Sequence, residues 1–261
     1  MELNRPNQKE EVPFFHYLEV YRGLDPYAIG KRCALPFDGN AFSLTLMGME
    51  YLAPYPAFEL RSRNAAFSPA ARRSVTTVTG AFAAPAPDDA APKIGAAGTA
   101  AAGTAMAGTA TGSSVSTRPA DPEQTACDIL ILRYLCEGRY YSDTGKRLSY
   151  NEVPWGPVYY RNFDGRCLKR LAYGFGNDIP RFKRIIESAP GLKAEKLPQG
   201  DAGYRIEFLS GLFISLILYA ADDEFPPSAQ ILFDDNFVFA FTAEDLAVVG
   251  EVVIDRLKRM G

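Results

Sequence analysis

The sequence predicts an α+β fold, in which a mainly antiparallel sheet packs against a buried central helix and a C-terminal helix, with a long disordered insertion. Three observations favour this fold class. Segments 42–61 and 203–241 carry the apolar, β-branched and aromatic patterns of strands. Segment 122–137 is apolar on nearly every side, which is typical of a helix inside a core. Segment 246–257 places apolar residues along one helical face, behind an N-cap at Thr242.

Two helices and a strand meander are expected before the insertion. Apolar residues recur at helical spacing over 14–21, and Asp25 followed by Pro26 provides an N-cap and a first-turn proline for a second helix. Apolar alternation over 42–51 predicts two strands around a turn, and segment 58–60 predicts a third strand.

Residues 62–120 differ sharply in composition from the rest of the chain. Ala, Gly, Thr, Ser and Pro dominate, and the middle of the segment is close to a repeat of Ala-Gly-Thr. Such a segment has little apolar surface to offset the entropy lost on ordering, so we expect a low-complexity disordered insertion within a single domain, 1–261. Two interpretations stay open for it, a tolerated insertion in a surface loop and a functional tether.

Helical signals resume after the insertion. Asp121 and Pro122 form a cap and a first turn, and Gly138 is placed to end that helix. Ser149 with Glu152 predicts one short capped turn.

The next segment, 155–163, is expected to be an aromatic loop, because Gly156 and Pro157 interrupt it. Asp164 is then placed to cap one further helix, and Asn177 or Asp178 to cap another.

The C-terminal block contains the clearest strand signals. Apolar and charged residues alternate over 204–208, and 212–219 is a continuous apolar run. Segments 231–233 and 237–241 flank three polar residues and predict a hairpin.

Composition limits the classes of partner. A net charge of −3 and a pI near 5.4 disfavour nucleic acid and anionic membranes. No apolar run approaches the ~20 residues that a membrane-spanning helix needs, and the N-terminus lacks a signal-peptide pattern, so we expect a cytoplasmic protein without membrane contact. Segment 161–196 holds nine basic and four acidic residues, and it predicts either solvated helix faces or a surface for an anionic ligand.

Signals for metals and nucleophiles are sparse. His16 is the single histidine, and we expect it to fill an aromatic helix face, which excludes multi-histidine zinc sites. The cysteines contain no CxxC pair, which favours free buried thiols over a metal site. They are Cys33, Cys127, Cys136 and Cys167.

The best metal candidate is the triplet Asp222, Asp223 and Glu224, since hard cations prefer clustered carboxylates. The competing interpretation is an acidic turn, because Asp is common in turns and caps.

A candidate ligand site lies around the aromatic segment. Trp155, Tyr159 and Tyr160 would wall a pocket, and Arg161 or Arg166 would meet an anion. The competing interpretation places Trp155 in the core, where its replacement by alanine would cost about 3–5 kcal/mol.

Four further motifs form a recognisable set. They are DDEFPPSAQILFDDNFVFAFTAEDL at 222–246, Gly48 with Tyr51, ILILRYL at 129–135, and SYNEVPWGPVYY at 149–160. On these motifs the chain, over 14–61 and 121–259, resembles an uncharacterised prokaryotic domain-of-unknown-function family, numbered three-seven-eight-six.

Some members of that family are joined to a cysteine-rich segment similar to the iron–sulfur part of corrinoid proteins. The resemblance therefore implies an accessory role near anaerobic corrinoid or one-carbon metabolism. This chain departs from those members because it has no CxxC cluster, and the resemblance supplies no catalytic residues.

No nucleophile–base pair or metal-ligand set stands out, so the sequence favours a non-catalytic binding or accessory protein with a protein partner. The alternative is a small-molecule-binding protein, or an enzyme, whose aromatic pocket near Trp155 accepts an anionic ligand. The sequence indicates no particular cofactor and leaves enzymatic activity open.

Overall fold

The structure, a computed structural model, describes residues 11–63 and 122–261. All of them belong to one unit of the chain, which comprises Met1–Phe67 and Ala120–Gly261. The insertion expected at 62–120 lies outside the described residues, apart from Ser62 and Arg63, which form part of a strand.

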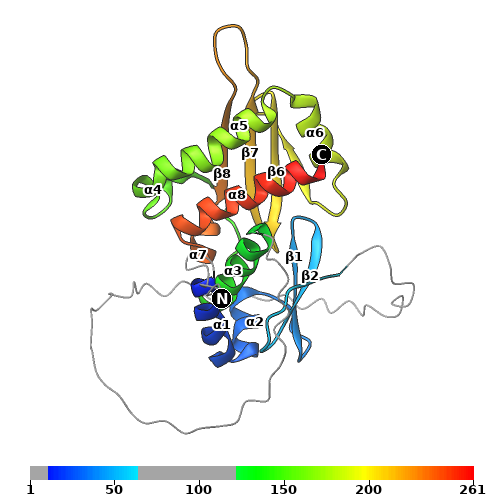
Figure 1. The fold of residues 1–261 in the computed structure, drawn as a ribbon, viewed down its shortest axis with the longest axis vertical. Helices are drawn as coiled ribbons and strands as arrows, with labels where there is room; N and C mark the ends of the chain where they lie inside the picture. Colours follow the sequence, from blue (N-terminus) through cyan, green and yellow to red (C-terminus); the bar gives the residue numbers. More distant parts are fainter. Residues whose placement is uncertain (1–10, 64–121) are drawn as a thin grey trace, which may run out of the picture. The chain divides into compact units, whose positions relative to one another are not determined.

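An antiparallel sheet of eight strands forms the centre of the described part of the chain (Figure 1). The strands are β1 (Ala41–Leu46), β2 (Met49–Pro54), β3 (Arg61–Arg63), β4 (Arg147–Ser149), β5 (Ala194–Leu197), β6 (Ala202–Leu209), β7 (Leu212–Tyr219) and β8 (Ser228–Asp234). Their order is β3-β2-β1-β6-β7-β8-β4, and β5 pairs with β6 beside this path. The pairing of β1 with β6, at Leu46 and Leu209, joins the N-terminal meander to the C-terminal strands.

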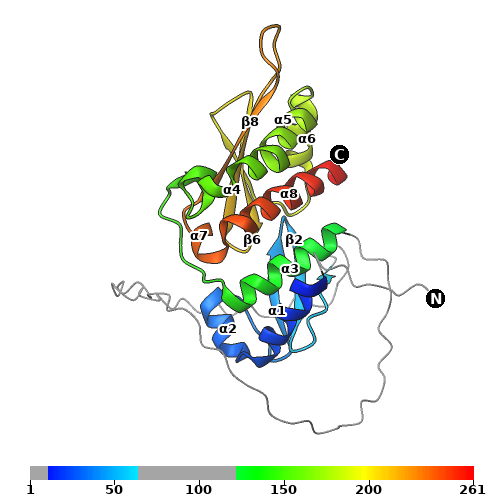
Figure 2. The ribbon, with the colours of Figure 1, turned by 60° about the vertical axis from the view of Figure 1, so that its left-hand side comes forward.

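Helices lie over one face of strands β6 to β8, as Figures 1 and 2 show for α4, α5 and α8. The helices are α1 (Glu11–Gly23), α2 (Pro26–Cys33), α3 (Pro122–Glu137), α4 (Gly156–Phe163), α5 (Lys169–Phe175), α6 (Ile179–Ser188), α7 (Phe237–Ala240) and α8 (Ala243–Met260), with a 3₁₀ turn η1 (Tyr150–Glu152) and a π turn η2 (Asp164–Leu168). α5 contacts β7 and β8, α6 contacts β6, and α3 packs on α8 and α1. The predicted α+β class is therefore confirmed.

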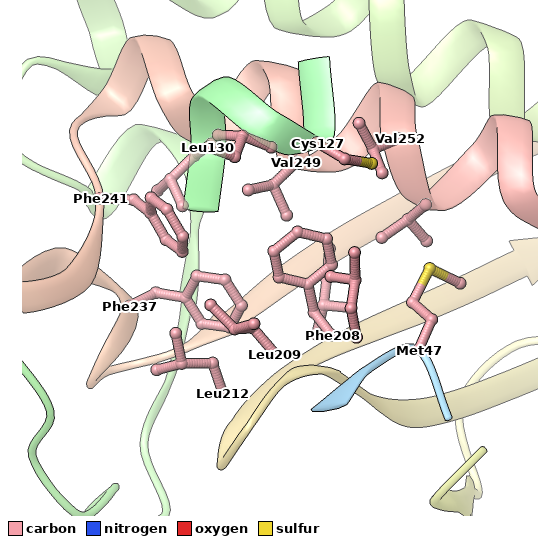
Figure 3. Packing of buried hydrophobic residues seen from close by; sticks show 14 of the residues in the cluster. Met47, Cys127, Leu130, Phe208, Leu209, Leu212, Phe237, Phe241, Val249 and Val252 are labelled. Atoms are coloured by element: carbon pink, nitrogen blue, oxygen red, sulfur yellow. The ribbon is translucent and has the colours of Figure 1, made fainter. Parts of the chain in front are cut away.

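The core lies between this sheet face and the helices. Alternate side chains of β6 and β7 point into it, because successive residues of a strand face opposite sides. Figure 3 shows Phe208 of β6 facing Phe237 and Phe241, with Leu130 of α3 and Val249 of α8 over them. The Phe208 ring centroid is 6.3 Å from that of Phe237 and 6.3 Å from that of Phe241. These aromatic contacts join the sheet to the segment before α8.

Four predicted helix starts are confirmed by their caps. In each of them the side chain of an acidic residue accepts hydrogen bonds from backbone N–H groups at the start of the helix. The pairs are Asp25 with Tyr27 at α2, Glu152 with Ser149 at η1, Asp178 with Arg181 at α6, and Asp245 with Thr242 at α8.

The hairpin predicted over 231–241 is wrong in its second half. β8 ends at Asp234, and α7 is a helical turn rather than a strand. Phe237, Ala240 and Phe241 are the buried residues, at helical spacings of three and four. Residues 237–241 are all apolar, and a continuous apolar run this short fits both a buried strand and a buried helix, so the sequence pattern does not separate them.

Asn236 anchors the chain where it leaves the sheet. Its side chain is almost fully buried, and its amide nitrogen donates to the carbonyl oxygens of Tyr141, at 3.0 Å, and Gly211, at 3.2 Å. The backbone of α7 makes its own hydrogen bond in place of a strand ladder, with the N–H of Phe241 donating to the carbonyl oxygen of Phe237 at 2.9 Å.

The aromatic loop predicted at 155–163 is also wrong, because residues 156–163 form α4. Pro157 lies in the first turn of this helix, where its missing N–H leaves no hydrogen bond unmade. Asp164 does not cap a new helix either. It lies in η2, which joins α4 to α5.

The third strand of the meander, β3, lies beyond the expected segment 58–60. Phe58 is buried with a left-handed φ of 46°, which is incompatible with a strand at that position.

Candidate functional site

Trp155 is held outward by the backbone on either side of it. The capping box of η1 fixes the preceding turn, with the Ser149 N–H donating to Glu152 at 2.7 Å. The N–H of Gly156 donates to the carbonyl oxygen of Val153 at 2.9 Å. Trp155 between them has a left-handed φ of 65° and is 75% exposed. The interpretation that places Trp155 in the core is therefore wrong.

Phe239 is a second exposed ring, and α7 determines its direction. Phe237 and Phe241 are buried on the inner side of that turn, so Phe239 lies outside and is 52% exposed. Its ring centroid is 4.6 Å from that of Tyr141, which supports it. Its carbonyl oxygen accepts from the N–H of Arg139 at 2.9 Å.

Trp155 and Phe239 line the same pocket, of about 240 Å³. Its polar side includes Arg133 and Glu137 of α3 and Asp245 of α8. Arg133 Nη1 is 2.5 Å from Asp245 Oδ1, while Asp245 Oδ2 accepts from the N–H and hydroxyl of Thr242 at 3.0 and 2.6 Å. Burial raises the pKa of Asp245, and the charge of Arg133 opposes that rise. We call this pocket the Trp155 pocket.

The residues predicted as one ligand site do not all meet there. Of that set, Trp155 lines the pocket, whereas Tyr159, Tyr160 and Arg161 are exposed along α4 and do not line it. Arg166 lies in a different pocket, where its Nε donates to Glu251 at 2.8 Å. Ligand binding by these residues remains a prediction.

That second pocket, of about 380 Å³, lies between α3, α8 and η2. Its floor is apolar and includes Leu130 and Val252. Three arginines on its walls pair with carboxylates of α8, and their charges are therefore offset. The pairs are Arg133 with Asp245, Arg166 with Glu251, and Arg170 with Asp255. The signal for this arrangement was present in the sequence as two i, i+4 pairs of like charge, at 166 and 170 and at 251 and 255.

The carboxylates predicted to bind a metal are exposed. Asp222 Oδ1 accepts from the N–H groups of Glu224, at 2.9 Å, and Phe225, at 2.6 Å, which is an Asx turn. Within residues 11–63 and 122–261, no group of three or more His, Cys, Asp or Glu side chains is placed to hold a metal ion. Metal binding by Asp222, Asp223 and Glu224 remains a prediction without geometric support in this part of the chain.

The thiols are poorly placed for chemistry. All four cysteines are buried and lie outside any disulfide bond. Burial raises the pKa of Cys136 and of Cys167 to about 12, so both are protonated at neutral pH and are weak nucleophiles. His16 is exposed, contrary to the expectation that it fills a helix face.

A family model described as Domain of unknown function (DUF3786) matches residues 109–256, more than half of the chain. This chain belongs to the DUF3786 family. The match covers both walls of the Trp155 pocket, from Arg133 to Asp245, and it leaves out the segment 14–61 that the resemblance also includes. No curated protein and no solved structure matches the chain.

The DUF3786 assignment fixes a family and no activity, so the function of this chain is unknown. Among the described helices, none has the length and apolar character needed to cross a membrane.

Proposed function

We propose that this DUF3786 protein is a non-catalytic binding or accessory protein, and that another protein docks on its exposed aromatic surface. We define the aromatic surface as Trp155, Val158, Phe239 and Tyr141. The observation that supports the proposal is the exposure of Trp155. It is the only tryptophan of the chain, and it is 75% accessible to solvent.

The conformation of Trp155 strengthens this argument. A left-handed φ is unfavourable for a bulky residue. Trp155 has this conformation, and its indole is exposed to solvent. Val158, one turn further along α4, is 70% exposed, and Tyr141 beside Phe239 is 47% exposed. Isolated apolar residues are common on surfaces, but two exposed rings that line one pocket, Trp155 and Phe239, are typical of an interaction site.

The energetics favour a protein partner. Covering about 100 Å² of this surface contributes roughly 2.5 kcal/mol, at about 25 cal/mol per Å². Tryptophan and tyrosine are also over-represented among the residues that dominate binding energy at protein interfaces. The pocket volume, about 240 Å³, is smaller than the ~300–1,000 Å³ typical of drug-sized ligands. A single side chain of a partner fits such a volume better than a cofactor does.

The alternative is a small-molecule-binding protein, or an enzyme, with an anionic ligand at Trp155. It is supported by the presence of Arg133 in the pocket, and it is weakened by the pairing of Arg133 with Asp245. The family resemblance further suggests that the partner belongs to anaerobic corrinoid or one-carbon metabolism, and this part of the proposal rests on that resemblance alone.

Site-specific photo-crosslinking in the native host tests the proposal. A benzophenone amino acid at position 158 is expected to give one discrete protein adduct, which disappears when Trp155→Ala is added. The matched control carries the same label in place of Tyr173, which is 59% exposed on α5. Equal adducts at both positions, or none at position 158, would contradict docking on the aromatic surface.

A further inference from the structure

We infer that the Trp155 pocket receives a basic side chain, the guanidinium of an arginine or the ammonium of a lysine, from the protein that docks there. This inference rests on the proposed function and specifies the chemistry of the partner.

Two aromatic side chains supply the first part of such a site. Trp155 and Phe239 line the pocket and are both more than half exposed, so their rings are open to an incoming group. Cations bind over aromatic faces within about 6 Å of the ring centre, and tryptophan is the strongest of these partners. The protein makes the same contact internally, with Arg205 Cζ 4.1 Å from the centre of the Phe213 ring.

Glu137 supplies the second part, a negative charge. It lies in the last turn of α3, lines the pocket and is exposed. Across the described ranges, none of the ion pairs within 4 Å includes Glu137. The C-terminal end of a helix also carries a partial negative charge, which favours a cation at this position.

The positive groups of the pocket are already neutralised. Arg133 is paired with Asp245 at 2.5 Å. The same carboxylate offsets the partial positive charge at the N-terminus of α8, because Asp245 forms the capping box with Thr242. The charge that remains at the pocket is that of Glu137, so a carboxylate or phosphate would be repelled and a cation attracted.

Trp155 is the only tryptophan, so its fluorescence reports directly on the pocket. The test titrates the full chain with three blocked peptides, Gly-Gly-X-Gly-Gly, in which X is arginine, the uncharged isostere citrulline, or glutamate. We expect saturable binding of the arginine peptide, and at least tenfold weaker binding of the other two. In Glu137→Gln we expect the arginine peptide to bind several-fold more weakly, whereas Glu19→Gln, an exposed change outside the pocket, should bind it as the wild type does.

Three results would overturn the inference. They are equal affinity for the arginine and citrulline peptides, an unchanged affinity in Glu137→Gln, or no change of fluorescence with the arginine peptide. Failure of this inference is distinguishable from failure of the proposed function. A cross-link at position 158 that needs Trp155 and persists in Glu137→Gln would show docking without recognition of a basic side chain.

Discussion

Arg133 of α3 and Asp245 of α8 form an ion pair, with 2.5 Å between Nη1 and Oδ1, and both residues line both pockets. The pair therefore separates the Trp155 pocket from the groove between α3, α8 and η2. It also joins the central helix to the C-terminal helix, since Asp245 forms the capping box of α8 with the N-cap Thr242. One buried contact thus links the geometry of the proposed binding site to the stability of the fold.

Removing Arg133 tests this link. In Arg133→Met we expect the free energy of unfolding to fall by about 3–5 kcal/mol, because Asp245 is almost fully buried and its charge would lose its partner. Urea denaturation followed by circular dichroism measures the change. The matched control is Arg61→Met, which breaks the exposed pair with Glu59 and should change stability by less than about 1 kcal/mol. Equal losses in the two variants would show that Asp245 does not depend on Arg133.

Trp155→Ala should leave the free energy of unfolding within about 1 kcal/mol of the wild type, because its indole contacts mainly solvent. Phe163→Ala provides the contrast on the same helix. Phe163 is 1% exposed and stacks on Tyr150 with 3.9 Å between ring centroids, so its loss should cost about 3–5 kcal/mol. Thermal and urea unfolding measure both. A large loss in Trp155→Ala would mean that the indole packs against the protein, and the aromatic surface would lose its central residue.

Gly156→Ala should disturb the position of Trp155. A Cβ at Gly156 would lie 1.8 Å from the carbonyl oxygen of Tyr150, so η1 and α4 must separate. We expect a loss of at least about 2 kcal/mol and a changed Trp155 emission spectrum. Gly165→Ala is the control, because a Cβ there meets no atom within 4 Å. A Gly156→Ala variant with unchanged stability and emission would contradict the tight contact between these two turns.

The sequence predicts the fold class and the helix caps well because both depend on local patterns. Each capping box involves two residues that are three positions apart, Ser149 with Glu152 and Thr242 with Asp245. The hydrogen bonds of each box therefore lie within one turn. The long apolar run of β7 is equally clear, since its side chains are buried on both faces of the sheet over residues 214–218.

The sequence predictions are wrong where contacts between residues far apart in the chain determine the structure. At the start of α7, Asn236 contacts Tyr141, which is 95 residues away in the chain. The local apolar run carries no information on that contact, and for the same reason no sequence pattern brings Trp155 next to Phe239 in one pocket. Glu137 was missed because its significance lies in having no ion-pair partner within 4 Å in the described part of the chain, and only a three-dimensional arrangement can show that.

Asp128 of α3 makes stability depend on pH. Burial raises the pKa of its carboxyl to about 6, and the hydrogen bond from Gln124 Nε2, at 2.8 Å, only partly opposes this. The folded state therefore holds a proton that the unfolded state releases at lower pH. Stability from this group is fully present below about pH 4 and is lost as the pH rises through about 6.

Asp128→Asn removes this titration, and we expect it to be more stable than the wild type by about 2 kcal/mol at pH 7.5 and by much less at pH 4.5. Urea denaturation of both proteins across this range measures the difference, and the comparison cancels the contributions of other titrating groups. An equal gain in the free energy of unfolding of Asp128→Asn at both pH values would contradict this prediction. It would mean that the carboxyl of Asp128 has the same pKa in the folded and unfolded chains, so that its burial beside Gln124 carries no electrostatic cost.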